Sequence, residues 1–218
     1  MLRLFATLGV FTLFAAGLAV TTQSAVAQAL AVVSGTLTVG LYIWLQRSLP
    51  PQNGSLKLPG LRDTVEVFRD QQGVPHISAR NLHDLYMAQG FVTAQDRLWS
   101  MDFARRQAQG RLSQVLGTAW IEYDQLLQKL QFDRAGVESL HAYSSETREH
   151  LDAYVSGINA CINTRPLPPQ FALLRYRPEP WRPADVLTTS KFLFGRADLT
   201  WLRDLLQTEL ITAVGAAK

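Results

Sequence analysis

The chain opens with a long apolar pattern. Residues 4–46 carry no charge and contain two apolar blocks, residues 4–20 and residues 25–45. The second block is about 21 residues long, close to the roughly 20 residues that a helix needs to cross the hydrocarbon of a bilayer. It ends in Tyr42 and Trp44, residues that suit the membrane–water interface. This pattern favours a membrane anchor in the second block.

A cleaved secretory signal is the competing interpretation of the same segment. Arg3 supplies a positively charged start, residues 4–20 an apolar centre, and Ala25-Val26-Ala27 a small-residue cleavage site. Residues 1–47 are therefore predicted to be a signal peptide or a signal-anchor transmembrane segment. Both interpretations predict an exported protein, either periplasmic or anchored to the membrane and facing the periplasmic or extracellular side.

A turn-rich linker and a hairpin follow the apolar segment. Residues 48–57 contain Pro50-Pro51 and Asn53-Gly54, which argue against regular structure there. Residues 64–69 alternate with the period of a β-strand, and residues 74–79 form a second extended run after a polar turn. The domain that this hairpin begins is predicted to cover residues 58–218.

Helical periodicity dominates the rest of the chain. Asn81 is a plausible N-cap, and the pattern after it continues to Gly110 with apolar residues on two neighbouring stripes, so this helix should be buried. Residues 164–182 are rich in proline and are predicted to be extended. Further helices are predicted over residues 124–140, from Ser144 or Ser145 onwards, and over residues 184–213, the last as one helix or two joined near Gly195. The predicted class is α+β and mostly helical.

Charge and cysteine content exclude several functions. The net charge of +3 is modest and is not clustered, so nucleic-acid binding has no support. Cys161 is the only cysteine, which rules out an intramolecular disulfide, and its apolar helical face favours a packed core thiol. The four histidines are scattered without a His-Glu-x-x-His pattern, which disfavours a zinc enzyme.

Polar residues on the hairpin and the first long helix allow a catalytic and a structural interpretation. In the catalytic one, His76 is a base and Asp96 or Asp102 orients it. In the structural one, Asp96-Arg97 and the Asp102 to Arg106 segment form ion pairs within the helix or with the hairpin. Buried polar groups need partners, and no serine lies in a Gly-x-Ser-x-Gly elbow, so the structural interpretation is favoured.

The order of the motifs is more informative than any single one. Their sequence and spacing resemble the start of the acylase chain in the penicillin amidase family, amide hydrolases whose nucleophile is an N-terminal residue uncovered by self-cleavage. The resemblance covers residues 58–215. The first motifs are Arg69-Asp70, Gly73-Val74-Pro75-His76-Ile77, Ala94-Gln95-Asp96-Arg97-Leu98, Met101-Asp102, Arg105-Arg106 and Gly110-Arg111-Leu112, and the later ones are Gly157-Ile158-Asn159-Ala160, Leu167-Pro168-Pro169-Gln170-Phe171 and Tyr176-Arg177-Pro178-Glu179-Pro180-Trp181.

The resemblance implies a fold and a chemistry that this chain would only partly supply. The family fold has a four-layer αββα core, and its nucleophile is the first residue of a second chain, the β-chain, released by autoproteolysis. The free α-amino group of that residue acts as the base. No catalytic residue is therefore predicted in this chain, and its expected partners are the β-chain portion of the same precursor and a small-molecule acyl amide substrate.

The resemblance also suggests three site residues after Trp181. Phe194 falls at an apolar position of the acyl pocket, and Asp198 falls near the pocket where the family has an apolar residue. Asp204 falls where the family carries a calcium-binding glutamate, and its shorter carboxylate keeps an oxygen donor suited to calcium. The alternatives are a core position for Phe194 and a surface position for each aspartate. No organic cofactor is expected.

The predicted function is that of the N-terminal part of an exported acylase precursor. Its substrates would be N-acylated small molecules such as β-lactams or acyl homoserine lactones. The chain is expected to continue beyond Lys218, because that residue interrupts the family pattern. The alternative is a membrane-anchored module that keeps the acylase scaffold and binds a ligand without hydrolysing it.

Overall fold

The computed structural model describes residues 25–46, 49, 53–197 and 200–215. The chain divides into two compact units, Met1–Pro50 and Pro51–Lys218. In the part of the chain that the structure describes, helices account for most residues and the one sheet is a two-stranded antiparallel hairpin.

The first unit contains helix α2, Ala25–Gln46. The helix predicted over residues 25–45 is therefore confirmed. Its stretch Gln28–Gln46 is long and apolar enough to cross a membrane, and it is the one such stretch among the described residues. The hydroxyl groups of Ser34, Thr36 and Thr38 donate to main-chain carbonyls of the same helix at 2.8–3.0 Å, so these polar groups are satisfied internally.

The hairpin consists of β1, Glu66–Arg69, and β2, Pro75–Ser78. Its register pairs Phe68 with His76. The Asp70 carboxylate fixes the turn by accepting the main-chain N–H groups of Gln72 and Val74, each at 2.9 Å. Gly73 has φ +80°, a conformation that glycine adopts at little cost. The predicted hairpin is confirmed.

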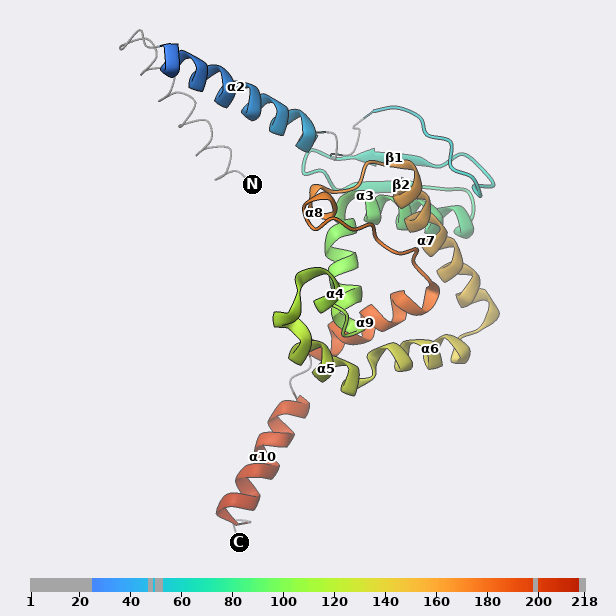
Figure 1. The fold of residues 1–218 in the computed structure, drawn as a ribbon. Helices are drawn as coiled ribbons and strands as arrows, with labels where there is room; N and C mark the ends of the chain where they lie inside the picture. The colour runs from blue at the N-terminus through green and yellow to red at the C-terminus, as the bar shows by residue number, and fades with distance from the viewer. Residues whose placement is uncertain (1–24, 47–48, 50–52, 198–199, 216–218) are drawn as a thin grey trace. The chain divides into compact units, whose positions relative to one another are not determined.

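Helix α3, Leu82–Ala108, is the central element of the second unit (Figure 1). Asn81 is its N-cap and accepts the N–H of Asp84, as its position before the helical pattern predicts. A kink at Arg97 interrupts the helical dihedral angles, and Gly110 follows the helix with φ +62°. The hairpin packs on α3 through β2.

Helix α7, Ser145–Thr164, packs along α3, and Ser144 is its N-cap. Two glycines allow the helices to approach closely. A Cβ added to Gly90 would lie 1.9 Å from the carbonyl oxygen of Tyr154, and one added to Gly157 would lie 1.9 Å from that of Met87. The main core forms where these helices meet, and its buried members are Phe91, Ala94, Leu98, Val155, Ile158, Cys161, Ile162, Phe171 and Trp181.

Shorter helices connect α3 to α7. They are α4, Ser113–Leu116, a 3-10 turn, Thr118–Trp120, and helices α5, Ile121–Leu130, and α6, Phe132–Ala142. The prediction of a single helix over residues 124–140 was wrong. Gln131 adopts φ +56° and separates two helices there, α5 and α6. The buried carboxylate of Asp124 accepts the N–H groups of Leu112 and Ser113 and joins α5 to the start of α4.

The C-terminal part contains three further helices. Helix α8, Pro169–Leu173, lies inside the proline-rich segment that was predicted to be extended, so that prediction was wrong for these five residues. Helix α9, Pro183–Ala197, packs against α6 and α3. Helix α10 covers Thr200–Val214. Of the two predicted alternatives, two helices are present, but Gly195 lies within α9 and not between them.

Candidate functional site

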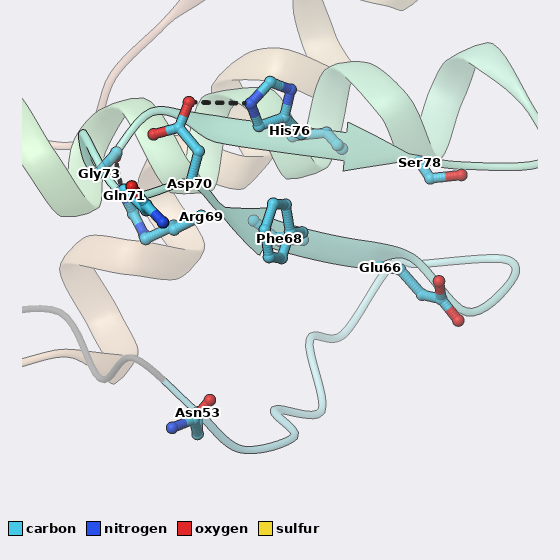
Figure 2. Close-up of a pocket in the computed structure, with 11 residues that line it drawn as sticks. Asn53, Glu66, Phe68, Arg69, Asp70, Gln71, Gly73, His76 and Ser78 are labelled. Carbon is cyan, nitrogen blue, oxygen red and sulfur yellow. Dashed lines mark hydrogen bonds and ion pairs between the residues drawn. The ribbon is translucent and has the colours of Figure 1, made fainter.

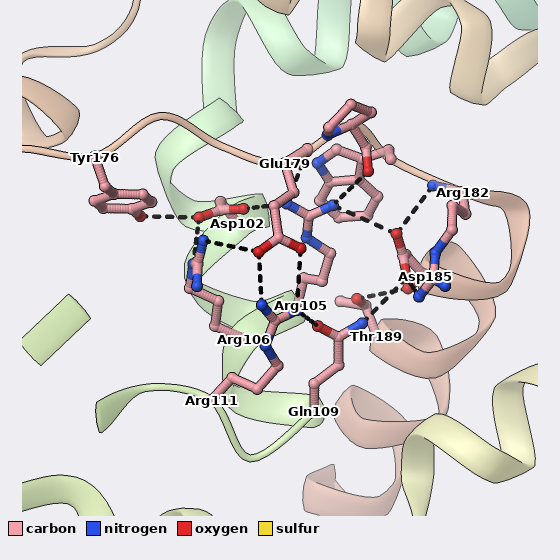
Figure 3. A network of polar contacts seen from close by, with 12 residues as sticks. Asp102, Arg105, Arg106, Gln109, Arg111, Tyr176, Glu179, Arg182, Asp185 and Thr189 are labelled. Carbon is pink, nitrogen blue, oxygen red and sulfur yellow. Dashed lines mark hydrogen bonds and ion pairs between the residues drawn. The ribbon is translucent and has the colours of Figure 1, made fainter. Parts of the chain in front are cut away.

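A buried ion-pair network joins α3 to the segment that leads into α9 (Figure 3). Its centre is Asp102, which is fully buried and accepts hydrogen bonds from Arg105, from Arg106 Nε at 2.9 Å and from Tyr176 Oη at 2.8 Å. Arg105 and Arg106 lie three and four residues after Asp102, so all three side chains share one face of the helix. The predicted ion pairs within this helix are confirmed.

Arg105 reaches beyond its own helix. Its guanidinium donates to the carbonyl oxygens of Glu179 at 3.0 Å and Pro180 at 3.2 Å, and it forms a 3.4 Å ion pair with Asp185. The guanidinium carbon lies 4.6 Å from the ring centroid of Trp181. The side chain is 3% exposed, so these contacts form away from bulk water. One arginine therefore binds α3 to residues 179–185.

A second set of bonds holds the same segment. Asn159 on α7 accepts the main-chain N–H of Trp181 at 2.8 Å and donates to its carbonyl at 2.9 Å. At the start of α9 the Asp185 carboxylate accepts the main-chain N–H of Arg182 at 2.9 Å, which is one of the two bonds of a capping box. The entry into α9 is thus fixed from α3, from α7 and by its own cap.

The edge of the network is more exposed. Arg111 makes a bidentate pair with Glu179, with distances of 2.6 and 3.1 Å. The hydrogen bond from Arg111 lowers the pKa of the Glu179 carboxyl. Burial, together with the neighbouring charge of Asp102, raises the pKa of the Tyr176 hydroxyl well above its ordinary value, so this phenol is a stable donor at neutral pH.

A cavity of about 760 Å³ lies beside the hairpin (Figure 2). Figure 2 shows Phe68 and His76 next to each other across the two strands, and Asn53 on the preceding segment. His76 Nε2 lies 3.2 Å from Asp70 Oδ2, and the His76 side chain is 60% exposed. The hydrogen bond from the N–H of Val74 and the one with His76 lower the pKa of Asp70.

The residues of the catalytic interpretation do not form a catalytic group. His76 contacts Asp70 in the turn, whereas Asp102 belongs to the buried arginine network. Asp96 makes a bidentate ion pair with Arg69 on β1, with both distances 2.9 Å. The structural interpretation of Asp96 as a helix–hairpin partner is confirmed. The ion pair with Arg69 gives the acidic side chain of Asp96 a partner on the hairpin.

The single cysteine is a core residue, as predicted. Cys161 is 3% exposed and belongs to the main apolar cluster. Burial raises the pKa of its thiol to about 11, which leaves it protonated and unreactive at neutral pH.

The predicted pocket residue Phe194 lies near the end of α9 and is 76% exposed, next to Leu193 at 52%. By contrast Phe192, two residues earlier, is 2% exposed and stacks edge-on against Phe132. Phe194 is thus an exposed aromatic residue and not part of the core. The predicted residue Asp198 lies outside the described residues.

The predicted calcium ligand Asp204 lies on α10 with its side chain 68% exposed, 4.0 Å from Arg203. Among the described residues no group of three or more His, Cys, Asp or Glu side chains is placed to hold a metal ion. A single exposed carboxylate does not make a calcium site, because calcium takes six to eight oxygen ligands. These residues alone therefore do not fit the ion.

The sequence did not reveal how Arg105, Asn159 and Asp185 act together. The motifs that contain Arg105 and Asn159 were recognised, but their partners lie on the chain 75 and 22 residues away. Such pairings have no local periodicity. The only signal was the presence of an arginine and an asparagine beside the apolar positions of the two helices, where a buried polar group without a partner would be costly.

Comparison with known proteins decides the family. Residues 64–218 match the model of the family described as penicillin amidase. The chain belongs to the penicillin amidase family. The resemblance carried by the ordered motifs is therefore confirmed.

Family relatives include enzymes with different names. The chain is 40% identical to penicillin acylase 2 proenzyme of Pseudomonas sp. (strain SE83) over 79% of its own length and 22% of the relative. It is 34% identical to penicillin G acylase of Escherichia coli over 67% of the chain and 17% of the relative. It is 33% identical to acyl-homoserine lactone acylase QuiP of Pseudomonas fluorescens (strain Pf0-1) over 71% of the chain and 20% of the relative. The chain thus spans about a fifth of the length of these curated relatives.

The solved structures include a penicillin amidase of similar fold. The thermostable penicillin G acylase of Alcaligenes faecalis matches with a TM-score of 0.58 and 30% identity, over 70% of this chain and 85% of that chain. The mostly helical architecture with a small hairpin is therefore similar to that of a penicillin acylase chain.

Proposed function

We propose that this chain is the N-terminal, α-chain-like part of an acylase precursor that hydrolyses the amide bond of N-acylated small molecules. The observation that carries the proposal is a difference in coverage. The chain matches 85% of one chain of a solved penicillin G acylase but about a fifth of each curated relative. This difference supports a two-part enzyme in which the present residues form the smaller part.

The chemistry would reside in the second part. The proposed nucleophile is the first residue of a β-chain, a Ser, Thr or Cys whose own α-amino group removes its proton. An α-amine with an ordinary pKa near 8 is partly neutral at working pH, which makes it a competent base. The acyl group would be transferred to this nucleophile and released by water, with main-chain donors stabilising the oxyanion. Completion of a four-layer αββα core by the β-chain is part of the same proposal.

The residues described here would contribute to the acyl pocket. Phe194 is exposed at the end of a helix whose start is held by Arg105 and Asn159, which supports a role as a pocket wall completed by the β-chain. Asp198 is proposed to lie near the same pocket. Calcium binding by Asp204 would need further oxygen ligands from outside the described residues. β-Lactams and acyl homoserine lactones are both candidate substrates, since relatives named for each match the chain.

The first unit would hold the enzyme at the membrane. Helix α2 exposes most of its large apolar side chains, and its hydroxyl groups are bonded within the helix. Both properties suit a hydrocarbon environment, in which every polar group must find a partner within the protein. We therefore propose export, with the domain on the periplasmic or extracellular side.

The test is to express the gene with its natural flanking sequence and to determine the intact masses and N-termini of the purified product. We expect two chains, the second beginning with Ser, Thr or Cys, and hydrolysis of acyl amides by the processed protein. Residues 1–218 expressed alone serve as the control and should stay unprocessed and inactive. A single unprocessed chain that binds but does not cleave acyl amides would instead support a non-catalytic binding module.

A further inference from the structure

We propose that Arg105 is a positioning residue for acyl-group selection, acting through the direction in which α9 presents Phe194. This inference rests on the proposed function, because it takes Phe194 as a wall of the acyl pocket. Arg105 itself is buried and lies on another helix. Its influence would be exerted through residues 179–185, which it binds directly.

Arg105 makes most of the polar contacts that join the two helices, and Gln109 at the end of α3 adds one, a hydrogen bond of 3.1 Å from its side-chain amide to Asp185. The Arg105 guanidinium contacts Asp102 on α3, two carbonyl oxygens of the incoming segment, and Asp185 in the first turn of α9 (Figure 3). The Trp181 ring covers the guanidinium at 4.6 Å. One planar group thus contacts four acceptors: two carboxylates and two main-chain carbonyl oxygens. Its donors point in fixed directions.

The helix transmits this position to the pocket residue. Phe194 follows Asp185 by nine residues, or about 14 Å of helix at roughly 1.5 Å per residue. A helix is stiff over this length, so a small tilt at its first turn moves Phe194 by about 1 Å. Displacements of this size at a substrate-contacting group can change rates by up to about 10²-fold. Because Phe194 would touch the acyl group, the displacement should affect acyl groups of different shape unequally.

Lysine cannot reproduce the contact. An ammonium group carries three donors on a flexible stem and lacks the planar face that stacks on Trp181. Arg105→Lys keeps the buried positive charge beside Asp102 and Asp185, so the pairing that stabilises the site is retained in part while the fixed direction is lost. This substitution therefore separates positioning from charge.

The experiment uses the complete protein, expressed with its natural flanking sequence. The readout is the ratio of kcat/KM for two amides of 4-nitroaniline, one with a phenylacetyl group and one with a straight-chain octanoyl group. The ratio is measured for the wild type, Arg105→Lys, Phe194→Ala and the double variant. Arg134→Lys is the matched control, since Arg134 makes an exposed ion pair with Glu138 on α6. Asp185→Asn is a second variant that weakens the same contact from the other side.

We expect Arg105→Lys to change the ratio by about tenfold, and we expect that change to disappear in the Phe194→Ala background. Asp185→Asn should change the ratio in the same direction, and Arg134→Lys should leave it unchanged. A residue that serves only stability would lower both rates equally and leave the ratio intact.

Three results would overturn the inference: an unchanged ratio in an active Arg105→Lys enzyme, a change that persists without Phe194, or loss of folded protein in both the Arg105 and the Asp185 variants. A wild-type protein that is processed but hydrolyses neither amide, nor others of an acyl series, would instead reject the proposed function.

Discussion

Asp84 is the clearest case of a buried charge stabilised entirely by hydrogen bonds. Its carboxylate has no exposed surface and accepts the main-chain N–H groups of Arg62 and Asp63 at 2.9 and 2.8 Å. Asn81 and His83 contact the same carboxylate at 2.8 and 3.0 Å. Burial acts to raise the pKa of this carboxyl, but the four hydrogen bonds outweigh burial and hold the pKa well below its ordinary value.

Asp84→Asn should therefore release the segment around Arg62 and Asp63 from α3. The amide group would direct N–H donors at other donors, at a cost of about 1–3 kcal/mol. Because the folded pKa is lowered, the stabilisation is fully present above the unfolded value of about 3.9 and is lost as the pH falls below it. Hydrogen exchange of these two amides should be at least about fivefold faster in the variant at pH 7, and the difference should shrink below about pH 4.

The matched control for this measurement is Asp63→Asn, an identical chemical change on an exposed side chain of the same segment. It should leave the exchange of both amides unchanged. An Asp84→Asn effect of equal size at pH 7 and pH 3 would contradict the assignment of the stabilisation to the carboxylate charge.

Residue type predicted the local roles better than the long-range ones. Asn81 was identified as an N-cap, and the next cap was narrowed to Ser144 or Ser145, because the side chain of a cap residue bonds to a main-chain N–H only a few residues ahead. Arg175 and Gln131 could not be identified as left-handed residues, with φ of +55° and +56°. Neither is glycine or asparagine, so the surrounding packing and not the residue imposes that conformation.

The crossing of α3 and α7 depends on two glycines that face the partner main chain. Gly90→Ala or Gly157→Ala would place a methyl carbon 1.9 Å from a carbonyl oxygen, so the helices must separate. Separation also loosens the core that lies along the crossing. We expect each substitution to cost about 3 kcal/mol or more and to lower the thermal midpoint of unfolding by about 6 °C or more, measured by circular dichroism.

Ser156→Ala is the matched control for this crossing, because Ser156 neighbours Gly157 but lies on the exposed side of α7. It should change the midpoint by less than about 2 °C. If Gly157→Ala behaved like Ser156→Ala, the close approach would not contribute to stability.

Periodicity predicted which segments are helical but not where two helices meet. The hairpin and the helices after Asn81 and Ser144 followed from their apolar spacing. The division of α5 from α6 at Gln131 did not, because a single left-handed residue leaves the apolar period on both sides intact. Helix α8 was missed because Pro169 occupies its first position, where proline is compatible with a helix, inside a segment whose other prolines indicate extended chain.

The candidate site shows the same limit over longer distances. The motif order predicted the family, whereas the pocket role of Phe194, whose side chain is 76% exposed, stays a prediction. The contacts that fix α9 join residues from α3, α7 and the proline-rich segment, and a single sequence contains no signal that pairs them. Only the three-dimensional arrangement showed that Arg105, Asn159 and the Asp185 cap together fix the entry into the helix.

The second unit exposes large apolar side chains on several of its elements. The chain spans about a fifth of the length of its curated relatives. Surfaces that the rest of such a protein would bury should therefore be exposed in this part of it. The exposed residues occur on several elements of the described chain and include Phe68, Leu126, Leu130, Leu173, Leu193 and Phe194.

We therefore expect residues 53–218, produced alone, to self-associate and to bind a hydrophobic dye. Exchanging Leu193 and Phe194 for serine should lower both effects, because these neighbours are 52% and 76% exposed and make little contact that folding requires. Size-exclusion chromatography with light scattering measures the association, and Lys129→Ser, on an exposed position of α5, is the control. A stable, monodisperse, dye-free fragment would mean that these apolar side chains are tolerated in water, and the argument for a missing covering chain would lose its physical basis.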